Sequence, residues 1–526
     1  MPALLHPGVY VSEVPSGARS IEGAPTSTTI FVGETERGPI GPTMIKSRTD
    51  YERMFGGYFR VRDPESPQPA PTRVLTAYSV DGFYLNGGTT AYVLRAMDPG
   101  DEEAPVTAER DSIEASSPGV WGNSVSVAFL PASGGSTERI RIDVVYESPR
   151  TGESAIVESF DRLSADVDDE NYVVDVLARS LYIRWGADDV VLPDLDIAAS
   201  PTGGAPEATD IIDAAVALDG GVGGGGDLDA ADYTLLMADR LAGVDDAALL
   251  VATCDALLTD TSYVDHVQAF IDFAEARPRQ DLFFVGDLPR QDDVGDPTQA
   301  TVATVTAYDS VTRSNFAGLY WPHVVVGDVV GVGRNPTITL PPSGYIAGLF
   351  ARTDGRRGVW KAPAGTEATL LGTSRLEYQL NDLHSDELNP EGINALRQIP
   401  GAGRVVWGAR TTIPASEWRY VPVRRTAIFL RTSIFNGIQW AVFEPNDEPL
   451  WSSLRASIGG FMETQFRNGA FAGRTSREAY FVKVDSETTT EIDQAAGVVN
   501  ILVGFCPLRP AEFVVVKLSQ KTQTAT

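Results

Sequence analysis

Cysteine is nearly absent from this chain, with Cys254 and Cys506 the only two among 526 residues. They lie far apart in the sequence, and their surroundings predict an apolar helix for the first and a strand end for the second. Free cysteine is among the most frequently buried residue types. We therefore expect two buried thiols and no disulfide, which fits synthesis in a reducing compartment.

Histidine is equally scarce, and its spacing matches no common metal or nucleophile motif. No two histidines are separated as in HxH or HxxxH, and the sequence contains no nucleophile elbow. It therefore nominates no catalytic residue, no metal ligand and no cofactor. A site assembled in space from distant residues leaves no such motif, so an α/β hydrolase-like enzyme is kept as an alternative. The histidines are His6, His266, His323 and His384.

The chain also lacks a long apolar run and an excess of positive charge. The first residues, MPALLHPGVYVSEV, contain neither the basic nor the apolar part of an export signal. No run is long enough to cross a bilayer, so we expect cytoplasmic synthesis without membrane insertion. Lysine and arginine number 42 against 71 aspartates and glutamates, and the resulting net charge of −29 argues against nucleic acid as a direct partner.

Two stretches imitate ligand sites but lack essential residues. The glycine-rich run 220–226 is not followed by Lys-Ser or Lys-Thr, so a flexible loop is favoured over a phosphate cradle. An acidic cluster at 166–171 lacks the central glycine and the terminal glutamate of a calcium loop. A solvated face or a helix cap is the better interpretation of that cluster.

The order of strand and helix patterns predicts a multidomain protein of mixed α+β and α/β class. Alternating strands and helices predict a discontinuous α/β sandwich domain formed by residues 26–97 and 206–365. Residues 98–205 carry alternating apolar patterns, such as 124–130 and 139–146, which predict an inserted β-rich outer domain. Residues 366–505 predict a C-terminal α/β core domain, and 1–25 and 506–526 are expected to be terminal arms.

The C-terminal region carries clear local signals. A helix is expected to begin at Asn389-Pro390-Glu391, and a glycine-rich turn at 401–403 should lead into a strand at 405–407. The acidic, proline-containing stretch 444–449 predicts the start of a helix that continues over 452–467. One side of that helix carries its large apolar residues, Leu454, Ile458, Phe461 and Met462.

Both chain ends contain a strand pattern without a neighbouring partner strand. Residues 7–14 and 512–518 have strand-type composition, but no hairpin turn connects either of them to a second strand. An unpaired terminal strand either frays or pairs with another chain through its main chain. The residues expected to pair between copies are Val9, Tyr10, Val11, Ser12, Phe513, Val514, Val515, Val516 and Lys517.

Several motifs together resemble the sheath proteins of contractile phage tails and related contractile injection systems. These are GIN at 392–394, WGART at 407–411, WRYVPVRR at 418–425 and VFEPND at 442–447, preceded by PPSGYIAGLFARTDGRRGVWKAPAG at 341–365. The resemblance implies a structural protein rather than an enzyme. Its copies would form a helical homopolymer of hexameric rings around an inner tube protein, and contraction would drive the tube through a target envelope.

The resemblance also implies partners and roles. Baseplate and terminator or cap proteins would complete the particle, which is assembled in the cytoplasm and is either a phage tail or an injection device. Terminal arms would join neighbouring copies in small shared sheets. The helix at 452–467 would face the tube through Ser452, Arg455, Glu463 and Arg467, although an ordinary amphipathic helix with a solvated charged face is the alternative. A static shell that polymerises in one lattice is a further alternative.

Overall fold

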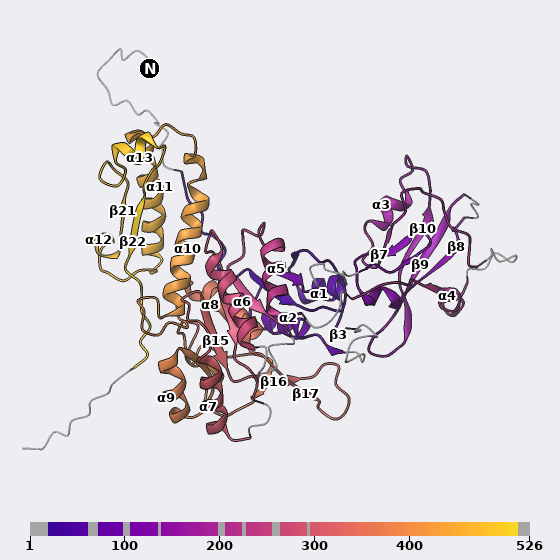
Figure 1. Ribbon diagram of the computed structural model, residues 1–526, viewed down its shortest axis with the longest axis horizontal. Helices are drawn as coiled ribbons and strands as arrows, with labels where there is room; N and C mark the ends of the chain where they lie inside the picture. The colour runs from indigo at the N-terminus through magenta and orange to yellow at the C-terminus, as the bar shows by residue number, and fades with distance from the viewer. Residues whose placement is uncertain are drawn as a thin grey trace, which may run out of the picture. The chain divides into compact units, whose positions relative to one another are not determined.

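The computed structural model describes residues 19–60, 72–97, 106–134, 138–197, 206–223, 228–254, 263–291 and 295–513 (Figure 1). Contacts between these residues divide the chain into two compact units. The main unit comprises the described parts of 25–357 and 362–424. The C-terminal unit comprises 19–24, 358–361 and 425–513.

An eight-stranded sheet forms the centre of the main unit, in the order β2-β5-β1-β13-β14-β15-β19-β20. The strands from β5 to β19 pair in parallel, whereas β2 and β20 are antiparallel strands at the two edges. In chain order they are β1 (Thr29–Gly33), β2 (Thr43–Ile45), β5 (Ala91–Arg95), β13 (Leu249–Ala252), β14 (Phe283–Asp287), β15 (Ala317–Trp321), β19 (Ile393–Ile399) and β20 (Gly403–Val406).

The inner strands are short continuous apolar runs, and every residue of β1, β13, β14 and β15 is buried. Strands of this kind are covered by helices on both faces. The predicted α/β pattern is therefore confirmed for this part of the chain. The helices of the main unit are α1 (Arg48–Phe55), α2 (Leu75–Asn86), α3 (Val173–Leu177), α4 (Ala208–Ala214), α5 (Ala230–Arg240), α6 (Tyr263–Ala276), α7 (Pro297–Tyr308), α8 (Ser343–Arg357) and α9 (Asp382–Glu391).

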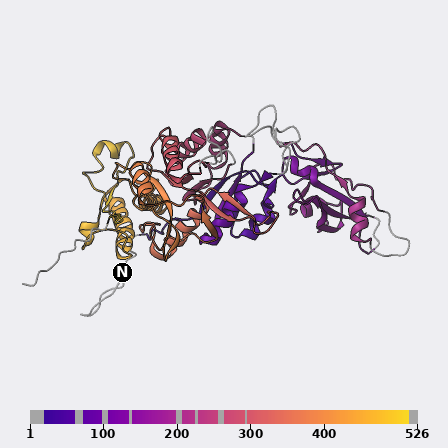
Figure 2. The ribbon, with the colours of Figure 1, turned by 90° about the horizontal axis from the view of Figure 1, so that it is seen from below.

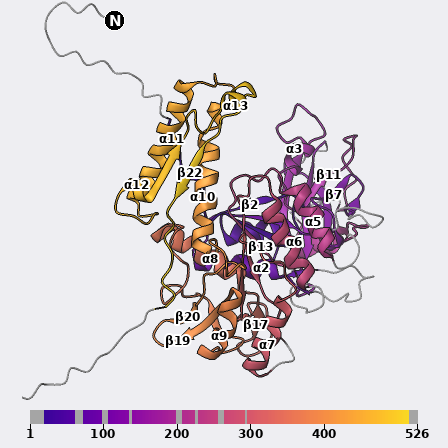
Figure 3. The ribbon, with the colours of Figure 1, turned by 60° about the vertical axis from the view of Figure 1, so that its left-hand side comes forward.

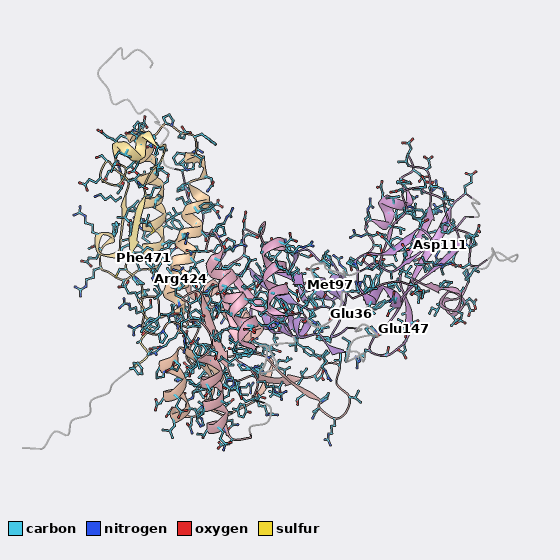
Figure 4. The ribbon with its side chains drawn as sticks, in the orientation of Figure 1. Glu36, Met97, Asp111, Glu147, Arg424 and Phe471 are labelled. Atoms are coloured by element: carbon cyan, nitrogen blue, oxygen red, sulfur yellow. The ribbon has the colours of Figure 1, made fainter. Side chains whose placement is uncertain are left out.

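A β-rich subdomain is inserted after β5, and Figure 2 shows its strands as a body of their own. Its two sheets enclose a core around Trp121. At the junction with the main sheet, the Tyr146 hydroxyl donates to the Glu36 carboxylate at 2.6 Å; Figure 4 labels Glu36 there. The strand orders of the two sheets are β10-β9-β8-β12 and β11-β7-β6. The bounds of these strands are β6 (Glu109–Arg110), β7 (Ile113–Ala115), β8 (Val125–Pro131), β9 (Ile140–Glu147), β10 (Ser154–Leu163), β11 (Ile183–Trp185) and β12 (Val216–Ala217).

Small two- and three-stranded sheets complete the main unit. They pair β3 with β4 and join β17-β16-β18. Their bounds are β3 (Phe59–Arg60), β4 (Thr72–Arg73), β16 (Val324–Gly327), β17 (Thr337–Leu340) and β18 (Thr373–Leu376).

Three boundaries differ from the sequence expectations. Strand pairing in the β-rich subdomain continues past residue 205, because β12 pairs with β8 and Val222 pairs with Val106. Residues 366–424 do not begin a new domain, since β19 and β20 extend the main sheet. The helix expected to start at Asn389 instead ends there: α9 runs over Asp382–Glu391 and accommodates Pro390 in its last turn before the left-handed Gly392.

The C-terminal unit is built from two long helices and a two-stranded antiparallel sheet (Figure 3). Helix α10 (Val421–Gly437) contains the boundary between the units, and its Leu430 packs with Ile458 and Phe461 of α11 (Glu448–Arg467). Asp447 caps α11 and Pro449 lies in its first turn, as the sequence predicts. The other elements are α12 (Ser476–Ala479), β21 (Tyr480–Lys483), α13 (Glu491–Ala495) and β22 (Leu502–Phe505).

The two cysteines are not joined in a disulfide. Cys254 is buried, as expected, but it directly follows strand β13 rather than lying in a helix. Cys506 is exposed, so the expectation of burial is wrong for this residue. Among the helices within the described ranges, none combines the length and apolar composition needed to cross a bilayer.

A buried ion pair in the segment that directly follows α6 gives a direct test of the main fold. The Arg277 guanidinium lies 2.6 Å from the Asp281 carboxylate, and Arg277 also donates to the Leu241 carbonyl at 2.8 Å. Replacing Asp281 by alanine leaves a buried charge without its carboxylate, so we expect Asp281→Ala to lower the free energy of unfolding by about 3–5 kcal/mol. Asp245→Ala, at the exposed pair with Arg279, should cost no more than about 1 kcal/mol in the same urea titration. Equal losses would contradict the prediction.

Candidate assembly surfaces

The sheet β21–β22 has two strands and two open edges. The strands pair through Tyr480↔Phe505 to Lys483↔Leu502, and within the described part of the chain no further strand is paired with either of them. Each outer edge therefore presents main-chain N–H and C=O groups that can accept another strand. An isolated two-stranded sheet is only marginally stable on its own, so its packing on the helices must hold it in place.

The two faces of this sheet differ in character. Tyr480, Val482 and Val503 pack toward the core formed with α11. On the opposite face, Phe481 and Leu502 are each 52% exposed. A strand added from another chain could cover this apolar face and also form hydrogen bonds with the main-chain groups at the edge of the sheet.

The last part of the predicted N-terminal arm, residues 19–24 of 1–25, is anchored on the same unit. The Arg19 N–H donates to Ser457 Oγ of α11, and the Ala24 N–H donates to Ser433 Oγ of α10, both at 2.9 Å. Between them, Ile21 is buried in the core shared by the two helices. Sequence analysis missed this anchor; its only signal is one isoleucine in a polar, glycine-containing stretch.

The first residue of the predicted C-terminal arm, which spans 506–526, is anchored there too. The Cys506 N–H donates to the Ala479 carbonyl, and the Ala472 N–H donates to the Cys506 carbonyl. Phe513, at the end of the described chain, is 76% exposed. The other predicted arm residues, Val9 to Ser12 and Val514 to Lys517, lie outside the described residues.

Helix α11 carries the residues predicted to face a tube, and the structure separates them into two groups. Ser452 and Arg467 are exposed. Arg455 is engaged within the unit, because it pairs with Glu448 at 2.6 Å and donates to the Val484 carbonyl. Glu463 likewise accepts hydrogen bonds from Arg467, Ser476 and Tyr480, so these two side chains stabilise the unit itself.

The exposed stripe of α11 is made of small side chains. It contains Ser452, Ala456, Gly460 and Thr464, which recur at four-residue intervals. A Cβ added at Gly460 would meet no atom within 4 Å. The stripe is therefore open, and it lets the main chain of the helix come close to a partner surface.

The usual ligand crevice of a doubly wound sheet is closed in this protein. It lies at the carboxyl ends of the strands where the strand order reverses, here between β1 and β13. The hydroxyls of Thr76 and Thr253 are hydrogen-bonded at 2.7 Å across this point. A Cβ at Gly33 would lie 2.2 Å from Thr253 Oγ1, so side chains fill the crevice.

A serine, a histidine and an aspartate of the main unit do not form a catalytic triad: Asp287 ends β14, His323 comes shortly after β15, and Ser343 begins α8. Ser343, His323 and Asp287 are all buried. Ser343 Oγ and His323 Nδ1 have no hydrogen-bond partner, and His323 Nε2 contacts the Leu288 carbonyl at 2.9 Å. Burial lowers the pKa of His323 to about 4. Asp287 accepts the Ser343 N–H at 2.8 Å at the start of α8, which is a structural role.

The sequence patterns that imitate ligand sites also have local structural roles. In the acidic cluster, Asp166 accepts the N–H of Asp168, while Asp169 accepts that of Asn171 and pairs with Arg139. In the glycine-rich run, Gly221 donates to Asn123 at 2.8 Å. The described residues contain no group of three or more acidic, cysteine or histidine side chains arranged to hold a metal ion.

Comparison of the sequence with known families finds two adjoining matches. A family model described as "Phage tail sheath protein central domain" matches residues 226–412, and one described as "Phage tail sheath C-terminal domain" matches residues 414–521. The first therefore covers much of the main sheet and the second covers most of the C-terminal unit.

Individual relatives agree with these matches. The chain is 28% identical over 264 residues to the tail sheath protein of Enterobacteria phage T4, which is 47% of this chain and 38% of that protein. It is 35% identical over 125 residues to the tail sheath protein of Vibrio phage KVP40, covering 23% and 19%, and 30% identical over 182 residues to a putative prophage major tail sheath protein of Pseudomonas aeruginosa, covering 34% and 45%. The chain thus spans less than half the length of these curated relatives.

Solved structures share the fold over nearly the whole chain. The sheath complex of an extracellular contractile injection system in its contracted state superimposes with a TM-score of 0.57 at 21% identity, covering 99% of both chains. A chain of the anti-feeding prophage baseplate gives 0.57 at 23% identity and covers 99% of this chain and 100% of its own.

Asp287 gives a pH-dependent prediction. Burial raises the pKa of Asp287 to about 7, against the lowering effect of the hydrogen bond from the Ser343 N–H. In the unfolded chain its pKa is about 4, so between these values the folded state binds the proton and the unfolded state does not. Its contribution to stability is therefore present below about pH 4 and is lost as the pH rises toward 7, with a slope of up to about 1.4 kcal/mol per pH unit.

We expect Asp287→Asn to remove this slope, because an amide oxygen can still accept the Ser343 N–H and no longer titrates. The measurement is urea unfolding between pH 4 and 8. The exposed Asp386→Asn serves as the matched control and should leave the wild-type profile unchanged. An Asp287→Asn profile parallel to that of the wild type would refute the assignment.

Proposed function

Because this chain belongs to the phage tail sheath family, we propose that it is the structural subunit of a contractile sleeve. Copies polymerise as a helical sleeve of hexameric rings around an inner tube. Contraction of the sleeve then drives the tube through a target envelope. Baseplate and terminator or cap proteins complete the particle, a phage tail or injection device assembled in the cytoplasm.

The observation that carries this proposal is the open sheet β21–β22 together with the anchors of both arms. Residues 19–24 and 506–513 belong to the same unit as the open sheet. A unit that holds the origins of two arms with strand-type sequences, and whose sheet has no partner strand at either edge within the described residues, suits exchange of strands between copies. Each copy can thus give strands to neighbours and receive strands from them.

Strand exchange also suits a contracting polymer. Main-chain pairing keeps neighbours connected while other contact surfaces slide, as a switch between two packings requires. Two of the solved relatives named above are a sheath in its contracted state and a baseplate component. Their shared fold supports the proposal that this chain works in the same kind of assembly.

Two other functions are less well supported. A hydrolase requires an accessible nucleophile, whereas Ser343 is buried and the sheet crevice is filled by Thr76 and Thr253. A static shell would use the same open edges but would form one lattice only. Electron microscopy that shows both a long narrow and a short wide sleeve would separate the contractile polymer from the shell.

Removal of either arm tests strand exchange. We expect chains lacking residues 1–14 or 512–526 to keep the melting temperature of the monomer, because the anchors at 19–24 and 506–511 are retained, but to form no sleeves by negative-stain electron microscopy. A full-length variant with Val9→Pro and Val11→Pro keeps the arm length and removes main-chain donors. It should fail in the same way. Normal sleeves from all three variants would rule out strand exchange.

The open stripe of α11 is proposed to contact the inner tube. Gly460→Gln places a long side chain where a Cβ meets no other atom, so the fold should keep its stability or gain up to about 1 kcal/mol. We expect sleeves to form but co-sedimentation with the tube protein to fall at least tenfold. Gly355→Gln, at an equally open helical glycine of α8, is the matched control and should bind normally. Undiminished binding by Gly460→Gln would instead identify α11 as an ordinary amphipathic helix.

A further inference from the structure

The main unit carries an apolar shelf formed by two exposed leucines. Leu85, near the end of α2, is 54% exposed, and Leu371, just before β18, is 44% exposed. Leu85 packs on Gly372, the residue after Leu371, because a Cβ added at Gly372 would lie 2.2 Å from Leu85 Cδ2. The side chain of Leu85 thus lies beside the main chain next to Leu371, and the two exposed leucines provide apolar surface of the kind found at the centre of an interface.

A buried asparagine holds this shelf in place. Asn86, the last residue of α2, is fully buried and contacts both main-chain groups of Leu371. It accepts the Leu371 N–H at 2.8 Å and donates to the Leu371 carbonyl at 3.2 Å. These hydrogen bonds fix the main chain of Leu371 while its side chain faces outward, so the fold itself keeps this leucine exposed.

Arginines surround the shelf, although the chain as a whole is strongly acidic. Arg352 packs its Cβ over Gly87 and donates to the Thr369 carbonyl, and Arg404 donates to Thr373 Oγ1 at 2.7 Å and to the Ser374 carbonyl. Arg356, one helical turn after Arg352, and Arg375, next to Ser374 in sequence, are both exposed. Burial and the charge of Arg356 lower the pKa of Arg352. Nearby acids are Glu367, which pairs with Arg357, and Asp354.

The C-terminal unit displays a tip of opposite charge. Phe443, between α10 and α11, is fully exposed and has a left-handed φ of 68°, a costly conformation for an aromatic residue. Glu444, Asp447 and Glu448 are exposed beside it in sequence. The loop is held firmly, since Asn446 accepts the Trp451 indole N–H at 2.9 Å and donates to the Val498 carbonyl at 3.0 Å.

We propose that the arginine-rimmed shelf around Leu85 and Leu371 binds the acidic Phe443 tip of a second copy of this chain. The two surfaces match in apolar character and in charge, because each has an apolar centre and their rims have opposite charges. A contact between different surfaces of identical copies is heterologous, and such contacts generate rings or helical filaments. This inference rests on the proposed function and specifies one of its contacts between copies.

Charge reversal tests the pairing, with self-association of the full chain measured by sedimentation velocity over a range of concentrations. The shelf variant combines Arg356→Glu with Arg375→Glu, and the tip variant is Glu444→Arg; none of these side chains makes an ion pair or hydrogen bond in the described structure. Each variant should weaken self-association at least tenfold. The variant that combines all three substitutions should recover most of it, because the charges then match again.

Controls separate this interface from general charge effects and from the proposed function. Arg334→Glu and Glu387→Arg reverse exposed charges elsewhere in the main unit and should associate like the wild type. Phe443→Ser should weaken association without a change in melting temperature. If the shelf variant and the tip variant both form sleeves like those of the wild type, or if the combined variant does not recover self-association, the shelf–tip pairing is overturned. Neither result would overturn the proposed sleeve. A wild-type chain that stays monomeric at every concentration would overturn the pairing and the proposed sleeve together.

Discussion

The structure depends on one constraint, which is that main-chain hydrogen-bonding groups must find partners. In the large sheet every inner strand has a partner strand on both sides, and residues 368–370 bond to the outer side of β20, where the Leu370 N–H donates to the Arg404 carbonyl. The small sheet β21–β22 does not, since both of its outer edges lack a partner strand in the described residues. The same requirement therefore holds the large sheet together and gives the small sheet of the C-terminal unit a reason to accept strands from another chain.

Much of the fold could be predicted from local patterns. The alternating strand and helix patterns placed an α/β domain at 26–97 and 206–365, where β1, β13, β14 and β15 lie, and the proline-containing acidic start of α11 was recognised. The errors have physical causes. Pro390 was taken as a helix start, but it lies in the last turn of α9 before Gly392 adopts a left-handed conformation. The membership of β19 and β20 in the main sheet depends on long-range pairing, which has no local signature.

The candidate surfaces were only partly visible in the sequence. The family motifs pointed to α11, but the charges on that helix could not be divided into exposed and internally paired groups without the positions of Val484, Ser476 and Tyr480. The leucine shelf was not predicted at all. Its parts are separated by almost 290 residues, and the asparagine that fixes Leu371 has the sequence appearance of an ordinary helix end.

The anchor of residues 19–24 has a mechanical consequence. This segment is fastened at two points to different helices, through Ser457 of α11 and Ser433 of α10, with Ile21 buried between them. Tension applied to the N-terminus is therefore carried first by the Arg19 attachment and then by the isoleucine and the Ala24 attachment. The load passes into two helices that are packed against each other, so α10 and α11 share it.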